Sequence, residues 1–535
     1  MIFANLVLKN GQVITVNPDN NLVSAVAVLG DKLCYVGSDA GVEEFIGPET
    51  RVIDLQGRSL LPGFNDAHIH TGITGLTLNS METDCGPERV STIEEMKDVL
   101  RAAAEKVPKG TLIRSFNYNH NYLKDGRHPT KWDLDEAVPD HPVLMTHASF
   151  HFSVANSMAL KIAGITNETS NPEGGVFERR NGELTGLAID NAHGMLYGAF
   201  PFTEEEMREG LKRADRAFME NGITSVQDAG ANTNYIKALI DLANDSQLNA
   251  RYYFMLFSFF NNKQFIDRLY DMGLHTGLGS NRVKMGPLKI MLDGSSICGT
   301  VAMKKPYNGN ANTTGTLTMA KDELNDYVLR AHQQGFQVAC HAIGDKAIEW
   351  IIDAYERAQK LFPREDCRHR IEHCTFPEAE QIRRIAENHI VVNTIPECVY
   401  SSGDAYLRQY GERMRYGYAQ QAYIKAGAVS AFSSDAPIAP INPMLGLYTA
   451  CHRVTYAGVD VWREEEEVTL LQAIRMYTYN GAYLSFEENE KGSLEVGKLA
   501  DMVVLSNPIL DIPLEEVKTT KVDMTIVGGK ICYQR

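Results

Sequence analysis

Several patterns that define common protein classes are missing from this sequence. Its nine cysteines include no Cys-x-x-Cys pair and are odd in number, which disfavours a disulfide framework and a zinc finger. No uncharged run of about 18 apolar residues occurs. The segment from Met1 to Gly11 has no basic stretch followed by a long apolar core. We therefore expect no membrane anchor, no export signal and a cytoplasmic location.

Positive charge is also scarce. The 52 lysines and arginines are outnumbered by 68 acidic residues, giving a formal net charge of −16, and this balance disfavours a nucleic-acid partner. What is present is an ordinary globular composition: 535 residues, 44% of them hydrophobic. That length accommodates one barrel-sized domain and one or two smaller ones.

Both ends of the chain show the pattern of short β-strands. Turns interrupt alternating apolar segments between Leu6 and Leu61, and the same character returns between Ala500 and Lys530. Neither end is long enough to bury a core alone. We expect the two ends, residues 1–60 and 485–535, to pack together as one small composite β-sandwich.

Between the ends, β-like and helical segments alternate repeatedly. This alternation predicts a fold of the α/β class, a closed (β/α)8 TIM-type barrel formed by residues 61–71 and 221–484. Eight candidate strands run near Leu61–Asp66, Ile223–Asp228, Tyr252–Phe257, Val283–Leu292, Phe336–Cys340, Arg370–Glu372, Ile390–Ile395 and Val429–Phe432. The interval 72–220 is too long for a loop and predicts an inserted cap subdomain.

The end of the first candidate strand carries two histidines, His68 and His70. Side chains two apart on a strand point to the same side, so both imidazoles can bind one cation. Taken alone the pair is a weak signal, because 15 histidines in a chain of this length produce such a spacing by chance. Further His, Lys and Asp residues at the ends of later strands strengthen the metal-site hypothesis.

Lys289 lies within an apolar run, where a charged amine is costly unless it is paired, neutralised or modified. Carbamylation by CO2 turns the amine into a carboxylate that bridges two cations. The alternative is an ion pair with Asp293 or another acid.

Three more strand ends carry candidate ligands. His341 and His373 each follow an apolar strand, and histidines on neighbouring strand ends of a barrel converge on one metal. Asp435 follows the last strand, where a carboxylate can accept a proton from metal-bound water and pass it to a leaving group. The alternatives are buried structural histidines and an N-capping aspartate.

These segments together resemble the amidohydrolase superfamily, and within it the YtcJ-like branch that includes N-substituted formamide deformylases. The resemblance is carried by His68 and His70 after Pro62-Gly63-Phe64, Lys289 before Asp293-Gly294, His341 before Gly344-Asp345, His373 in Arg370-Ile371-Glu372-His373 and Asp435 in Ser433-Ser434-Asp435-Ala436-Pro437. Secondary segments, among them Leu134–Val143 and Gly492–Asp501, extend it over nearly the whole chain.

The resemblance implies a metal site held by His68, His70, His341, His373 and Asp435, with Lys289 as a carboxylated bridge. One or two divalent ions are expected, with zinc first and manganese or iron as alternatives. His151 resembles a histidine of the inserted segment that faces the pocket in this branch, and a structural role is its alternative.

The function expected from these residues is metal-dependent hydrolysis of a non-peptide C–N bond in an amide or an N-acyl or N-formyl amine, with Asp435 as the proton shuttle. One alternative is a mononuclear-metal deaminase of a heterocycle, although Gly344 stands where such enzymes generally have a glutamate. Another is a non-catalytic assembly protein on the same barrel, which the retained candidate ligands disfavour.

The expected partner is a small amide-type substrate, with a homodimer as the default oligomer. The aromatic, weakly polar character of five candidate pocket residues suggests an apolar group on the substrate. These residues are Tyr118, His120, His151, Cys298 and Tyr400.

Overall fold

The centre of the molecule is an eight-stranded parallel barrel. A computed structural model describes residues 3–78, 83–257, 263–309 and 312–535. The barrel strands, in chain order, are β8 (Phe64–Ile69), β14 (Ile223–Ala231), β15 (Arg251–Phe257), β16 (Val283–Met291), β17 (Val338–Ala342), β18 (Arg370–His373), β19 (Val391–Thr394) and β20 (Ser430–Phe432). Neighbours in sequence are neighbours in the sheet, and every pairing is parallel. The predicted barrel is confirmed.

The segment after β20 joins the last strand to the first. The backbone N–H of Asp435 donates to the carbonyl of His68 at 2.8 Å, and the N–H of His70 donates to the carbonyl of Ala436 at 3.0 Å. These two bonds bring the segment that follows β20 against the carboxyl end of β8. The carboxyl ends of the strands thereby form one rim, where reactive groups of such barrels lie.

Helices surround the barrel because their apolar residues recur on one side. In α11 (Asp345–Leu361) the buried residues follow helical spacing: Ala347, Ile348, Ile351, Ile352, Tyr355 and Ala358. The other helices of this layer and its connections are α2 (Thr71–Leu78), α7 (Glu204–Glu220), α8 (Thr233–Asn244), α9 (Lys263–Asp271), α10 (Lys321–Gln333), α12 (Ala379–Glu387), α13 (Glu397–Tyr410), α14 (Gln421–Ala426), α15 (Pro443–His452), α17 (Leu470–Met476) and α18 (Tyr479–Leu484).

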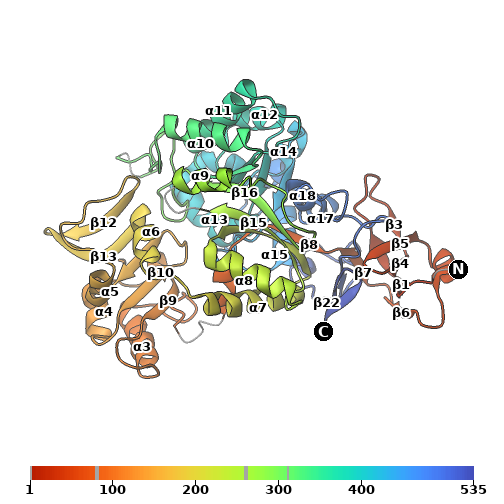
Figure 1. Ribbon diagram of the computed structural model, residues 1–535, viewed down its shortest axis with the longest axis horizontal. Coiled ribbons are helices and arrows are strands. Elements are labelled where there is room, and N and C mark those ends of the chain that lie inside the picture. Colours follow the sequence, from red (N-terminus) through yellow and green to blue (C-terminus); the bar gives the residue numbers. More distant parts are fainter. Residues whose placement is uncertain (1–2, 79–82, 258–262, 310–311) are drawn as a thin grey trace.

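The two chain ends meet in a pair of sheets on one side of the barrel (Figure 1). One sheet has the order β5-β4-β1-β6 and the other β23-β22-β21-β7-β2-β3. Their strands are β1 (Leu6–Lys9), β2 (Gln12–Ile14), β3 (Leu22–Val23), β4 (Ala25–Leu29), β5 (Lys32–Gly37), β6 (Arg51–Asp54), β7 (Ser59–Pro62), β21 (Met502–Leu505), β22 (Val522–Val527) and β23 (Lys530–Gln534). β21 pairs antiparallel with β7, and Leu8, Val26, Met502 and Ile526 share one buried core. The composite β-structure is therefore confirmed.

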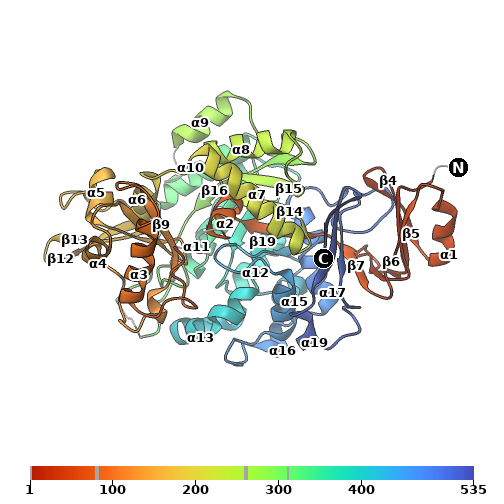
Figure 2. The same ribbon diagram turned by 90° about the horizontal axis from the view of Figure 1, so that it is seen from below.

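A separate sheet lies on the opposite side of the barrel, within the inserted segment (Figure 2). Its order is β12-β13-β11-β10-β9. The strands are β9 (Ile113–Tyr118), β10 (Val143–His147), β11 (Phe152–Ala155), β12 (Gly175–Arg180) and β13 (Glu183–Asp190), accompanied by α3 (Ile93–Ala104), α4 (Lys131–Ala137), α5 (Ser157–Ile162) and α6 (Asn191–Gly198). The end of the 72–220 interval, helix α7, packs instead against α2 and α8 of the barrel layer.

None of the helices within the described residues combines the length and the apolar character that crossing a membrane requires.

Candidate metal centre

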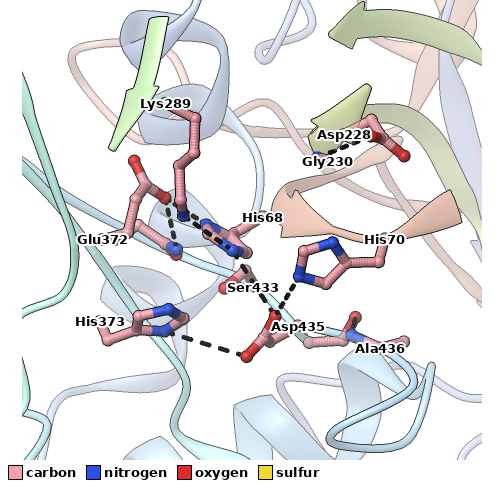
Figure 3. Close-up of polar contacts among 12 residues, drawn as sticks. His68, His70, Asp228, Gly230, Lys289, Glu372, His373, Ser433, Asp435 and Ala436 are labelled. Atoms are coloured by element: carbon pink, nitrogen blue, oxygen red, sulfur yellow. Dashed lines mark hydrogen bonds and ion pairs between the residues drawn. The ribbon is translucent and has the colours of Figure 1, made fainter. Parts of the chain in front are cut away.

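His68 and His70 leave the end of β8 and face the carboxylate of Asp435 (Figure 3). The Nε2 atoms of His68 and His70 lie 3.5 and 3.4 Å from the same oxygen, Asp435 Oδ1. Ligand atoms of the three residues all lie within 4.8 Å of one another. His68 is buried, whereas the side chain of His70 is 31% exposed and borders the cavity above the rim.

Asp435 Oδ1 is buried and accepts no hydrogen bond from any residue that the structure describes. A buried carboxylate oxygen without a donor is costly, and a cation shared with the two imidazoles removes that cost. The backbone of Asp435 also has a positive φ of 53°, which is uncommon for residues other than glycine. The donor set therefore fits a divalent metal ion.

Glu372 and Arg370 orient the ring of His68 on its Nδ1 side, away from Asp435. The Glu372 carboxylate accepts the Nδ1–H of His68, and it also accepts Arg370 Nε at 2.6 Å. Burial alone raises the pKa of Glu372, but Arg370 and His68 outweigh burial and hold that pKa well below its usual range. The hydrogen bond from Nδ1 fixes the ring tautomer and leaves the Nε2 lone pair directed at Asp435.

Lys289 reaches the same centre from β16. Its Nζ lies 3.4 Å from His68 Nε2, and the side chain is buried. Burial lowers the pKa of Lys289 to about 8, which raises the fraction of neutral amine, the form that reacts with CO2. The alternative ion pair with Asp293 is not formed. Asp293 accepts backbone N–H groups of Ala302, Ile343 and Gly344, and within the described ranges no carboxylate pairs with Lys289.

His341 and His373 are the remaining candidate ligands at the rim. The ring centroids of His341 and His373 are 4.6 Å apart, and those of His68 and His373 are 4.8 Å apart. His341 Nε2 donates to the carbonyl of Gly294 at 2.9 Å, which leaves Nδ1 as its ligand atom. Burial lowers the pKa values of His341 and His373 well below the ordinary value, so both rings are neutral, as a metal ligand requires.

The structure thus brings together all six residues predicted as ligands: His68, His70, Lys289, His341, His373 and Asp435. They line one cavity, and His151 of the inserted segment lines it as well. Tyr118 and Cys298 are not among the lining residues. Tyr118 is buried in the inserted segment beside His128, and the Cys298 thiol donates to Ser149 Oγ at 3.1 Å.

Sequence reasoning missed several groups that shape the site. Glu372 is not among the predicted site residues, although a strand-end acid beside a candidate ligand is a signal for a supporting carboxylate. Asp228 ends a predicted strand in the same way. Its Oδ2 accepts the backbone N–H of Thr71 at 2.7 Å, which fixes the chain directly after His70.

A second group of metal-binding residue types, His332, Cys367 and His369, differs from this centre. His369 Nδ1 accepts the N–H of Val338, His369 Nε2 donates to His332 Nδ1 at 2.8 Å, and His332 Nε2 donates to the carbonyl of Phe362 at 2.6 Å. Every ring nitrogen of the two histidines is therefore engaged within the protein. These hydrogen bonds connect parts of the barrel, and they leave no ring nitrogen of His332 or His369 available to bind a metal.

The chain is similar to several known proteins in sequence and in fold. The chain is 30% identical to protein LONG AFTER FAR-RED 3 of Arabidopsis thaliana, over 99% of this chain and 92% of that protein. It is 29% identical to the N-substituted formamide deformylase of Arthrobacter pascens, over 99% of this chain and 98% of that protein. It is also 29% identical to the putative amidohydrolase YtcJ of Bacillus subtilis, over 98% of each chain. A solved structure of an uncharacterized metal-dependent hydrolase from Pyrococcus horikoshii is 25% identical, with a TM-score of 0.79 over 95% of this chain and 99% of that one.

The model of the family described as amidohydrolase matches residues 51–533, which include the barrel and every candidate ligand. On this match, the chain belongs to the amidohydrolase family.

Proposed function

We propose that this protein is a metal-dependent hydrolase that cleaves the C–N bond of an amide, an N-acyl amine or an N-formyl amine. One observation carries the proposal: the unpartnered Asp435 Oδ1 faces the Nε2 atoms of both His68 and His70, while Lys289 lies beside His68. The formamide deformylase relative supports the choice of bond, because that relative is similar over nearly its full length.

His68, His70 and Asp435 would hold one ion. His341 and His373 would hold a second, with a carboxylated Lys289 between the two ions. Zinc is our first choice because imidazole and carboxylate groups are its usual ligands, and manganese or iron are the alternatives. Bound divalent metal lowers the pKa of water to about 7 and polarises a carbonyl group.

The proton transfers of the reaction are assigned to a side chain of the protein. Asp435 is the only carboxylate whose oxygen faces His68 and His70 among the described residues. It accepts the proton of the attacking water and returns it to the departing nitrogen, so that the amine leaves as a neutral molecule. Glu372 keeps the His68 ring in the tautomer that this arrangement needs.

The cavity favours a substrate with an apolar substituent. Next to the polar rim it is lined by apolar side chains of the inserted segment, α7 and α8: Phe150, Tyr197, Phe202, Met207 and Tyr235. An amide that places its carbonyl group at the rim would bury such a substituent against these side chains.

Deamination of a heterocycle is less well supported. The position three residues after His341, where such enzymes generally carry a glutamate, is Gly344. A Cβ atom on Gly344 would lie 2.0 Å from the carbonyl oxygen of Ala302, so the packing has no room for a side chain there.

A substrate screen with purified protein tests the proposal. Zinc-loaded and manganese-loaded protein is offered N-formyl and N-acyl amines, small amides, cyclic ureas, lactones and a panel of nucleobases. We expect release of an amine from at least one N-formyl or N-acyl amine, abolished by a chelator and restored by the metal. Ammonia release from nucleobases alone would instead support the deaminase. Protein that binds no metal would support a non-catalytic role.

A further inference from the structure

A histidine–aspartate pair lies on the wall of the cavity outside the metal centre. His151 Nδ1 and Asp190 Oδ1 are 2.8 Å apart, and both residues line the cavity. Their side chains are 15% and 7% exposed. The proposed function assigns no role to either residue.

The inserted sheet holds the pair rigidly. His151 directly precedes β11 and Asp190 ends β13, two antiparallel neighbours in the sheet. The backbone N–H of Asp190 donates to the carbonyl of His151 at 2.8 Å, and the N–H of His151 donates to Ser149 Oγ at 3.2 Å. Asp190 has a positive φ of 49°, a conformation that is costly for an aspartate and therefore points to a functional constraint on its carboxylate.

The hydrogen bond between His151 and Asp190 determines which nitrogen of the neutral His151 ring carries the proton. An ionised carboxylate only accepts hydrogen bonds, so His151 Nδ1 carries the proton. In the neutral form of the ring this leaves Nε2 as an acceptor, and no described residue donates to it. The ring lies beside His341, with centroids 5.7 Å apart. His151 Nε2 is therefore an acceptor without a donor among the described residues, and it lies beside the candidate metal centre.

His151 and Asp435 come from different parts of the molecule. Asp435 follows β20 next to β8, whereas His151 stands beside His341 at the end of β17, four strands from β8 in the barrel. Both residues line the same cavity, so a substrate nitrogen placed between them would direct its lone pair toward Asp435 and its N–H toward His151.

We propose that His151, oriented by Asp190, accepts the N–H of the scissile amide and so makes the enzyme select secondary amides, which carry one N–H, over tertiary amides, which carry none. This inference rests on the proposed amide hydrolysis and adds a specificity-determining residue to it. No covalent step involves His151. Its hydrogen bond positions the leaving nitrogen.

The test compares two probes that differ by one methyl group, N-(2-phenylethyl)formamide and N-methyl-N-(2-phenylethyl)formamide, with the metal-loaded protein. We expect the wild type to hydrolyse the secondary amide at least about tenfold faster, since one unsatisfied hydrogen bond in a buried site is worth about that factor or more. His151→Leu should slow the secondary amide by about tenfold and leave the tertiary amide within about twofold. The unchanged tertiary rate shows that the fold and metal centre are intact.

Two further variants separate the hydrogen bond from the bulk of the ring. His151→Gln keeps an acceptor oxygen near the position of Nε2 and should retain part of the preference. Asp190→Asn keeps the ring, but its amide can donate to Nδ1 and move the ring proton to Nε2, so the preference should fall.

A wild type without preference, or a His151→Leu variant that slows both amides equally, would overturn the inference while leaving amide hydrolysis intact. A metal-loaded wild type that hydrolyses neither amide would instead overturn, for these probes, the activity on which the inference rests.

Discussion

At the scale of single residues, Asp435 combines two tasks in one carboxylate. Oδ1 faces His68 and His70, and Oδ2 lies 4.0 Å from His373 Nδ1. Asp435→Asn keeps an oxygen for the metal but cannot accept a proton. We expect metal content near that of the wild type and turnover lower by at least about a hundredfold, measured by elemental analysis and initial rates. Unchanged turnover would remove Asp435 from the proton-transfer role.

The amine of Lys289 makes a separate prediction, because a carboxylated bridge supports two ions and an unmodified amine favours one. In bicarbonate buffer we expect two metal equivalents per chain for the wild type and one for Lys289→Met. Lys109→Met is the matched control, since the side chain of Lys109 is 80% exposed and far from any candidate ligand in sequence. One equivalent for the wild type, with and without bicarbonate, would rule out the bridge.

At the scale of elements, helices α2 and α7 touch through their backbones. A Cβ atom on Gly75 would lie 1.7 Å from the carbonyl oxygen of Gly210, and one on Gly210 would lie 2.6 Å from that of Gly72. Because α2 begins directly after His70, this contact also bears on the position of a candidate ligand.

Gly75→Ala should therefore lower the free energy of unfolding by about 1–3 kcal/mol, because the two helices must separate. Gly198→Ala in α6 is the control. Nothing lies within 4 Å of its added Cβ, so the alanine should be neutral or stabilise by about 0.5–1 kcal/mol. Urea unfolding of both variants measures the difference, and equal stabilities would contradict the close helix contact.

The barrel elements were predictable because their signal is local. Alternating strands and helices were visible in the sequence, and strand ends carried His68, Lys289 and His341. Contacts between residues that are distant in the sequence leave no comparable pattern in it. The hydrogen bond from His68 to Glu372 spans 304 positions, and the pairing of His151 with Asp190 depends on the register of β11 and β13. Tyr118 and Cys298 look like pocket residues in the sequence, yet neither lines the cavity. Tyr118 contacts His128 within the inserted segment, and Cys298, which follows β16, donates to Ser149 of that segment.

At the scale of the whole molecule, a buried ion pair ties the barrel to the composite sheets. Arg251, the first residue of β15, contacts Asp501 next to β21 through two bonds, Nε to Oδ2 at 2.6 Å and Nη2 to Oδ1 at 2.9 Å. Both side chains are buried, so removing one partner leaves an uncompensated charge.

Asp501→Ala should accordingly cost about 3–5 kcal/mol of stability, seen as a lower thermal unfolding midpoint. Asp140→Ala, which breaks the exposed pair with Lys109, should change stability by less than about 1 kcal/mol. A midpoint for Asp501→Ala equal to that of the control would show that the composite sheets and the barrel do not depend on this pair.

The central claim is that side chains from separate barrel strands bind metal together at one rim. Anomalous X-ray diffraction from crystals of the zinc-loaded protein tests it most directly. The account predicts a zinc peak at about 2.0–2.2 Å from His68 Nε2, His70 Nε2 and an oxygen of Asp435. No peak among these three side chains at saturating zinc, or zinc bound only away from this rim, would contradict it.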